Sequence, residues 1–387
     1  MSESTDLAVL TGAKTVSNTA LRWVGAFLPT LERAFGASTG TLTSIMGAAE
    51  LGGLTTTATG RLLDRGRERA VFVAGLAGVA ASSLIALGGS PWTFAVAYTV
   101  LIVGVANLTV AGHVWIGHRI PFHARGRAIG TYELSWAIAL LVGAPLIAVL
   151  IKGFGWRGPY VALAVGSFGA ALLVRARVAA GGADRTDDAR ATGRLGPGAF
   201  APMVASAATA ASGLGLFVVS GSWLDDDHGV STGGLGVIAA AYGAVELISS
   251  SAVALVADRV GLRRSVLIGL AGVLSGCALV VASGESRGVA VAGLLVFLCG
   301  FEYAFVSSLT LVTEAAPEAR GRAVGMSNAI GTLARAASVV VSGQLYESVG
   351  INGTVAWVAG AAGLAVVMTF LTRTASKPPA PAEAAMR

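Results

Sequence analysis

The run Arg125-Gly-Arg-Ala-Ile-Gly130 recurs 195 residues later as Arg320-Gly-Arg-Ala-Val-Gly325. Two further runs recur in the same order at nearly the same offset. These are Gly36-Ala-Ser-Thr-Gly40, which returns as Gly229-Val-Ser-Thr-Gly233, and Asp64-Arg65, which returns as Asp258-Arg259. The offset drifts by one residue at a time, as small loop insertions would produce. Three matches in register indicate that the chain consists of two homologous halves.

Both halves are mostly apolar. Of the 387 residues, 54% are hydrophobic and only 12% are charged, whereas a soluble domain carries roughly 25% charged residues. A helix that crosses a bilayer needs about 20 apolar residues. Stretches of that kind cover residues 10–31, 40–62, 70–89, 92–117, 128–151, 157–175, 198–222, 232–256, 265–284, 289–313, 323–346 and 353–372. Because they lack the alternation of strands, we expect an all-α membrane protein with twelve transmembrane helices.

These stretches define the domain organisation. We expect an N-terminal six-helix half at residues 1–175 and a C-terminal six-helix half at 198–373. A charged cytoplasmic linker at 176–197 separates them, and a proline-containing tail at 374–387 should be disordered. Six is an even number, so both halves enter the membrane in the same sense and form parallel repeats.

The distribution of basic residues predicts the orientation. With the N-terminus inside, the cytoplasmic loops and the linker hold seventeen Lys and Arg residues, against four in the opposite loops. Loops rich in Lys and Arg stay in the cytoplasm. We therefore expect a multi-pass protein of the bacterial cytoplasmic membrane, with both termini cytoplasmic.

Several function classes are excluded by what the sequence lacks. The net charge of +6 lies in short clusters between apolar stretches, which does not favour nucleic acid as a partner. We find no phosphate-binding Gly-rich loop with Lys and no nucleophile elbow. His113, His118 and His123 have no Cys or acidic partners beside them in the sequence, so we expect no metal site. The expectation is a protein without enzymatic activity or cofactor, acting as a monomer in the lipid bilayer on a small molecule and protons.

Four motifs carry a resemblance to the major facilitator superfamily over almost the whole chain. They are Gly60-Arg-Leu-Leu-Asp64-Arg-Gly-Arg-Glu-Arg69, its echo Ala254-Leu-Val-Ala-Asp258-Arg-Val-Gly-Leu-Arg-Arg264, the P-x-x-x-R-G-R-A-x-G run from Pro121, and Trp156-Arg-Gly-Pro-Tyr160. The first copy is one residue short before its second Gly, and the second has Ala for the leading Gly. The resemblance implies a transporter of the major facilitator fold that works by alternating access.

A closer similarity to twelve-helix drug and metabolite efflux members rests on three features. They are Arg22 followed by Phe27-Leu-Pro29, then Phe301-Glu-Tyr303, and a partial efflux motif, Gly143-Ala-Pro145, which lacks the trailing Gly pair. The resemblance implies proton-coupled export of a small amphipathic organic compound. The alternatives are proton-coupled uptake of a sugar or an organic acid and, from another class, a membrane sensor or scaffold that does not transport.

The resemblance also implies a cytoplasmic latch. Asp64 would face the start of the 323–346 helix near Ala323, where a carboxylate is stabilised by the helix dipole, and Asp258 would do the same at the 128–151 helix. The alternative is that the arginines of these loops only set the topology. The residues assigned to the latch are Gly60, Asp64, Arg65, Arg67, Asp258, Arg259, Arg263 and Arg264.

Six ionisable residues lie inside the expected spans: Arg22, Glu50, Glu133, Glu246, Glu302 and Arg335. Each would cost roughly 2.5–3.5 kcal/mol on insertion scales, so each needs a partner or a task. We expect Arg22 to pair with Glu50, and Arg335 with Glu246 or Glu302. A carboxylate left over should spend part of a transport cycle protonated, unless all four are structural.

The resemblance favours Glu302 and Arg22 as coupling residues, because helices 1, 4, 7 and 10 line the cavity in that family. Glu302 is equivalent to Asn107, and Glu133 to Asn328, both at offset 195. Polar and aromatic residues near that cavity could contact a substrate, or could be core residues. They are Asn107, Trp136, Tyr242 and Tyr303.

Overall fold

The structure is a computed structural model that describes residues 3–179, 195–316 and 319–372, in which all regular structure is helical. The N-terminal half comprises α1 (Glu3–Ala26), α2 (Leu28–Phe35), α3 (Thr39–Glu50), η1 (Leu51–Thr55), α4 (Thr56–Leu63), α5 (Glu68–Ala86), α6 (Pro91–Arg119), α7 (Phe122–Ile138), η2 (Ala139–Gly143), α8 (Ala144–Phe154) and α9 (Arg157–Arg177). The C-terminal half comprises η3 (Pro197–Ala199), α10 (Phe200–Asp226), α11 (Thr232–Val260), α12 (Leu262–Ala282), α13 (Arg287–Glu314), α14 (Arg320–Val349) and α15 (Ile351–Leu371). Most of the expected linker and the whole tail from 374 lie outside the described residues.

Ten helices in the described parts are long and apolar enough to cross a membrane. The expected spans at 10–31 and 40–62 are each divided, so the count of twelve stays a prediction. The first is interrupted at Phe27, just before Pro29 in the first turn of α2, because proline cannot donate a helical hydrogen bond. The second passes through the 3-10 turn η1, which holds Gly52 and Gly53.

The span at 128–151 is continuous but irregular. We expected Pro145 to bend it, and the structure has a π-helical turn, η2, that ends two residues before this proline. A π turn absorbs an extra residue where the regular hydrogen bonds are interrupted. Gly143 ends this turn, and a Cβ there would lie 2.6 Å from Thr19 Oγ1 on α1. The glycine therefore allows the close packing that we expected at this position.

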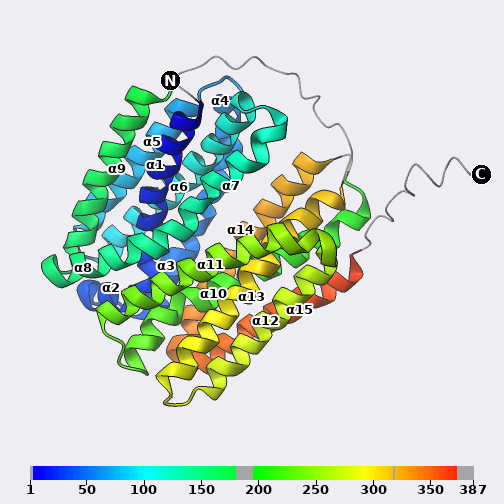
Figure 1. The fold of residues 1–387 in the computed structure, drawn as a ribbon. Coiled ribbons are helices and arrows are strands. Elements are labelled where there is room, and N and C mark those ends of the chain that lie inside the picture. The colour runs from blue at the N-terminus through cyan, green and yellow to red at the C-terminus, as the bar shows by residue number, and fades with distance from the viewer. Residues whose placement is uncertain (1–2, 180–194, 317–318, 373–387) are drawn as a thin grey trace, which may run out of the picture.

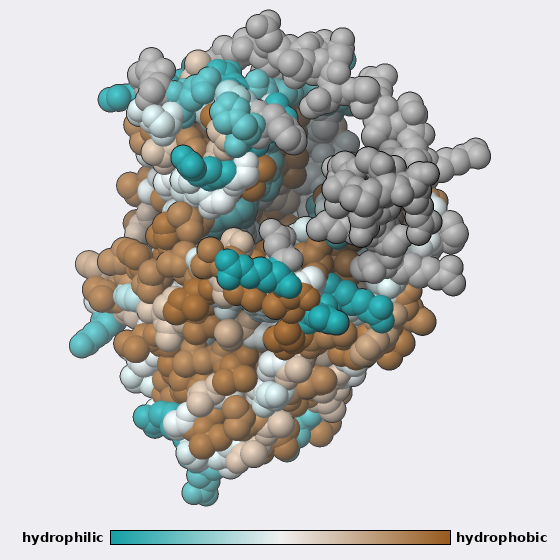
Figure 2. All heavy atoms as spheres, turned by 45° about the vertical axis from the view of Figure 1, so that its right-hand side comes forward, coloured by the Kyte–Doolittle hydropathy of each residue, from teal (hydrophilic) through white to brown (hydrophobic). Residues whose placement is uncertain are grey.

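The two halves lie side by side, and the long helices of each run between the same two ends of the molecule (Figure 1). We call the end that carries the N-terminus and α4 the basic end, because the arginine-rich loops lie there. We call the other end, with α2 and the turn after α8, the closed end. Hydrophobic residues cover a broad part of the face in Figure 2, and many hydrophilic ones gather near its upper end.

Close packing between the halves is concentrated from the middle of the helices to the closed end. A Cβ on Gly47 of α3 would lie 2.6 Å from Ala336 O of α14. One on Gly243 of α11 would lie 2.4 Å from Leu141 N of η2. Real Cβ contacts of this length do not occur, so the glycines allow the backbones of the two halves to touch.

The basic-end parts of the same helices differ. A Cβ on Gly60 of α4, Gly130 of α7 or Gly325 of α14 would meet no atom within 4 Å. Leu62 and Met326, which are also near this end, are 38% and 47% exposed. Among the described residues, the halves are therefore packed together at the closed end and not at the basic end.

Candidate functional site

A bidentate ion pair joins the halves in the middle of the molecule. Arg22 of α1 binds Glu246 of α11 through both terminal nitrogens, and the two side chains are only 11% and 7% exposed. Arg22 Nη1 also donates to Trp136 O at 3.0 Å, and the guanidinium lies 5.5 Å from the Trp136 ring centroid. Planar two-point pairing of this kind fixes the orientation of both groups.

A second ion pair joins the halves with reversed polarity. Arg335 Nε of α14 lies 3.4 Å from Glu50 Oε2 of α3, and Arg335 Nη2 donates to Thr332 Oγ1 at 3.2 Å. The pairings that we expected, Arg22 with Glu50 and Arg335 with Glu246 or Glu302, are wrong. Each arginine neutralises a carboxylate of the other half, because the contact between halves brings α1 to α11 and α14 to α3.

Glu133 has a cationic partner that sequence reasoning missed. Lys14 of α1, whose side chain is fully buried, donates to Glu133 Oε1 at 2.7 Å. His113 Nε2 of α6 lies 2.7 Å from the same oxygen. The Lys14 ammonium also lies 4.0 Å from the centroid of the Tyr132 ring, a cation–π arrangement. The signal was available, since Lys14 lies two helical turns before Arg22 in an apolar stretch.

Glu302 of α13 makes a neutral contact: Ser250 Oγ of α11 donates to its Oε1 at 2.8 Å. The equivalent contact in the first half lies 195 residues earlier, where Asn107 Nδ2 donates to Thr55 Oγ1 at 2.9 Å. The repeat therefore preserves one polar helix–helix contact and places a carboxyl group in the second copy only. Among the described residues, Glu302 is the only one of the four intramembrane glutamates without a Lys, Arg or His partner within ion-pair distance.

Of the four residues assigned to a substrate cavity, Trp136 and Tyr242 share one neighbourhood, because the Arg22 guanidinium also lies 5.6 Å from the Phe217 ring centroid. Asn107 and Tyr303 have other partners among the described residues. Trp136 lies beside Arg22, and Asn107 is bound to Thr55. Tyr242 is 4% exposed and its ring centroid lies 6.0 Å from that of Phe217. Tyr303 is half-buried and its hydroxyl donates to Ser265 Oγ at 3.5 Å. A role in substrate contact remains a prediction for each of them.

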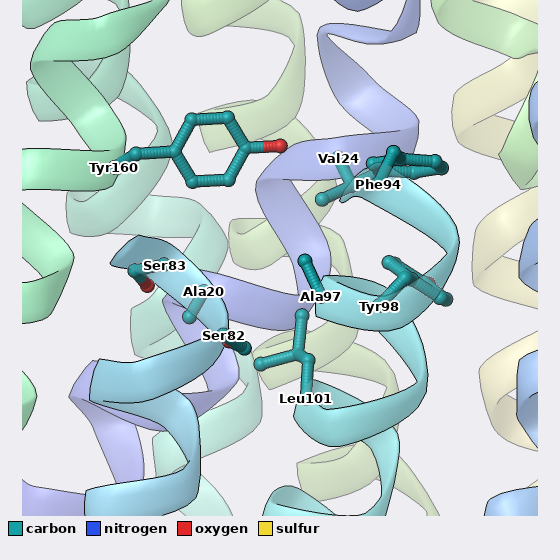
Figure 3. A pocket seen from close by; sticks show the side chains of 9 residues that line it. All are labelled: Ala20, Val24, Ser82, Ser83, Phe94, Ala97, Tyr98, Leu101 and Tyr160. Carbon is teal, nitrogen blue, oxygen red and sulfur yellow. The ribbon is translucent and has the colours of Figure 1, made fainter. Parts of the chain in front are cut away.

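The internal cavity shown in Figure 3 is too small for an organic substrate. It has a volume of about 10 Å³ and lies between α1, α5, α6 and α9 of the first half. The Tyr160 hydroxyl has no hydrogen-bond partner in the described structure. A space of this size holds at most a single water molecule.

The residues assigned to the latch lie at the basic end, and those whose side chains are described show no hydrogen bond or ion pair to the other half. Asp64 is exposed at the end of α4, and within the described residues its side chain makes no hydrogen bond. Arg263 donates to Phe370 O at 2.8 Å within its own half. The side chain of Asp258 lies outside the described structure. The remaining members of the set on the loops are exposed: Arg65, Arg67, Arg259 and Arg264.

A half-buried carboxyl group at the closed end was also missed. Glu32 of α2 lies just beyond the expected 10–31 span, and its Oε1 accepts hydrogen bonds of 2.7 Å from Thr39 and Ser222. Loss of hydration raises the pKa of this carboxyl group above its ordinary value of 4.5. The two hydroxyl groups and Arg33 lower the pKa, Asp226 raises it, and the net direction is upward. Because Ser222 belongs to the other half, this environment exists only while the closed end is shut.

A profile of the Major Facilitator Superfamily matches residues 10–205 and again 203–386. A bacterial homologue of the human lysosomal transporter Spinster, inward-facing and unoccupied, is 14% identical with a TM-score of 0.75, covering 96% of this chain and 95% of that one. The xylose transporter of E. coli in an inward open conformation is 14% identical with a TM-score of 0.74, covering 98% and 97%. The corresponding values for a nucleoside transporter are 13%, 0.74, 96% and 98%. No curated protein sequence matches the chain.

Proposed function

This chain belongs to the major facilitator superfamily and is a transporter, not an enzyme, and from that premise we propose that it exports a small amphipathic organic compound in exchange for protons. Export by alternating access needs a site that is reached from one side at a time. The halves pack together at the closed end and separate at the basic end, which supports one such state. Their separation in the opposite sense would give the other state.

The orientation in this proposal follows from charge. The basic end carries the loops around Arg65, Arg125 and Arg259, and such loops stay in the cytoplasm. The structure is then an inward-facing state of a protein in the bacterial cytoplasmic membrane. Cysteines replacing exposed Trp92 or Glu285 should react with an impermeant thiol reagent added outside, and one replacing Arg67 should not. Reaction of the cysteine at position 67 together with those at 92 and 285, all from the outside, would reject this orientation.

Proton coupling rests on one observation: Glu302 is a carboxyl group at membrane depth whose described polar partner is the neutral Ser250. An ionised carboxylate there is costly without a cation. Binding and release of a proton at Glu302 would therefore be linked to a change in its surroundings. The ion pairs of Arg22 and Arg335 need no such exchange, because each carboxylate already has a guanidinium partner.

Vesicle transport tests the proposal. Ethidium, an amphipathic cation, should accumulate in inverted vesicles that contain the chain when their lumen is acidic, and should not when the gradient is collapsed. D-xylose accumulation in right-side-out vesicles with an acidic exterior would instead support the uptake alternative. Transport of either probe that ignores the gradient would reject proton coupling.

A further inference from the structure

The last turn of α14 reaches across the closed end to the start of α3. Glu347 Oε2 accepts hydrogen bonds from Gly40 N at 2.9 Å and from Ser38 Oγ at 3.0 Å. Gln344, one turn earlier, donates to Gly40 O and to Ser44 Oγ, both at 3.1 Å. A carboxylate of the second half therefore caps a helix of the first half. The partial positive charge and free N–H groups of a helix N-terminus stabilise an anion in this position.

Gly40 is what lets the carboxylate approach. A Cβ at this position would lie 2.1 Å from Glu347 Oε2 and 3.0 Å from Gln344 Nε2. An alanine at position 40 is compatible with the helix but would displace both side chains. The contact can thus be removed from either side of the interface. Glu347→Gln removes the charge of the carboxylate, and Gly40→Ala blocks its approach.

The internal repeat provides the matched position that lacks this contact. Offset 195 relates Glu347 to Lys152, and each lies three residues before a glycine of positive φ that ends its helix, Gly350 at 79° and Gly155 at 65°. A lysine has only donors, and its charge is unfavourable at a helix N-terminus. It cannot cap a helix as Glu347 does.

The equivalent of the α3 N-terminus is the start of α11. Ser231 caps this helix as Ser38 caps α3, and Gly233 takes the place of Gly40. A Cβ on Gly233 would have only Ser231 Oγ at 4.0 Å. The edge between α8 and α11 therefore has the same cap sequence, but no carboxylate from the other half lies on it in the part of the chain that the structure describes.

We propose that Glu347 is a one-sided latch of the closed end, which holds α14 to α3 and has no counterpart between α8 and α11. The inference rests on the proposed alternating access, because the contact must break whenever the closed end opens. Breaking it exposes the α3 N-terminus and frees the last turn of α14. The closed end should then open more easily at this edge in any variant that loses the cap.

A buried reporter tests the latch without substrate or gradient. Thr43 of α3 is 0% exposed beside Gly343, so a cysteine there reacts with a maleimide only when the α3–α14 edge opens. The protein, reconstituted in lipid nanodiscs, carries Thr43→Cys and lacks Cys277 and Cys299. Glu347→Gln and Gly40→Ala should each raise the labelling rate about fivefold, the factor expected for the loss of a partly exposed carboxylate–dipole contact.

Gly233→Ala is the matched control, because it makes the same change at the edge without the latch, and its labelling rate should equal that of the parent. Unchanged rates in both Glu347→Gln and Gly40→Ala would overturn the latch, as would equal acceleration by Gly233→Ala. Thermal unfolding of each variant separates opening from loss of the fold. A chain that transports neither ethidium nor D-xylose but keeps this labelling pattern would reject the proposed function and retain the latch.

Discussion

The ion pair between Arg22 and Glu246 should stabilise the shut closed end rather than either half alone. At about 4 Å between charge centres and an effective dielectric constant of about 20, the attraction is about 4 kcal/mol. Both groups are nearly buried, and removal of one partner from a buried pair typically costs about 3–5 kcal/mol because the other charge is left uncompensated. Since the partners belong to different halves, separation of the halves gives the remaining charge access to water.

We therefore expect Arg22→Gln and Glu246→Gln each to shift the protein toward the state in which the halves separate at the closed end. A cysteine replacing Ala239 of α11, which is 1% exposed, reports this opening through its labelling rate in a background without Cys277 and Cys299. Each single variant should raise the rate at least tenfold, since about 1.4 kcal/mol corresponds to a factor of ten. The double variant should label more slowly than either single one, because it leaves no unpaired charge.

The second ion pair provides a graded comparison. Arg335 and Glu50 meet through one contact of 3.4 Å, and their side chains are 31% and 14% exposed. Glu50→Gln should therefore accelerate labelling less than Glu246→Gln does. If the double variant Arg22→Gln/Glu246→Gln shows the product of the two single effects, the groups do not interact and the reasoning is refuted.

Three further predictions concern packing, the latch at the basic end and pH. Gly243→Ala places a Cβ 2.4 Å from Leu141 N, so the closed end should fail to shut and labelling at position 239 should become fast; slow labelling would contradict the backbone contact. Asp64 is exposed in this state, so Asp64→Asn should leave its stability unchanged and slow transport through the opposite state. A cysteine replacing Met326 should then be protected less often during turnover, whereas unchanged transport and protection would leave the loop with a topogenic role only. The raised pKa of Glu32 means that the shut closed end binds this proton more tightly than the open one. Closure should weaken as external pH rises from 4.5 through the raised value. Glu32→Gln should abolish that dependence of the labelling rate, and persistence of the full dependence would assign it to another group.

The repeat and the apolar stretches predicted the all-helical two-half fold because both are properties of the local sequence. They could not locate the breaks around Phe27 and in η1, because short-range backbone geometry determines where a regular helix is interrupted. The ionisable positions were also visible as charges in apolar sequence. Their partners were not, since α1 meets α11 and α14 meets α3 only through the packing of two halves in one particular state.

Lys14 shows why a charge count from sequence was incomplete. With this lysine treated only as an interruption of a helix, four carboxylates faced two guanidinium groups, and two were left over. In the structure Glu133 is paired with Lys14 and His113. Among the described residues, Glu302 is therefore the one intramembrane glutamate without a cationic partner. For that reason the prediction of proton coupling now concerns Glu302 alone, and not two of the four glutamates.

Proton-driven transport by the Glu302→Gln variant is the most direct test of the central proposal. Glu302→Gln imitates the protonated group and keeps an acceptor for the Ser250 hydroxyl. The measurement is ethidium flux in proteoliposomes with and without a pH gradient, with Glu285→Gln, the same change at an exposed carboxyl group, as the control. The account predicts a stable Glu302→Gln protein that still exchanges ethidium without a gradient but loses the acceleration that a gradient gives. A stable Glu302→Gln protein with full gradient-driven transport would contradict it and direct attention to Glu133 or Glu50.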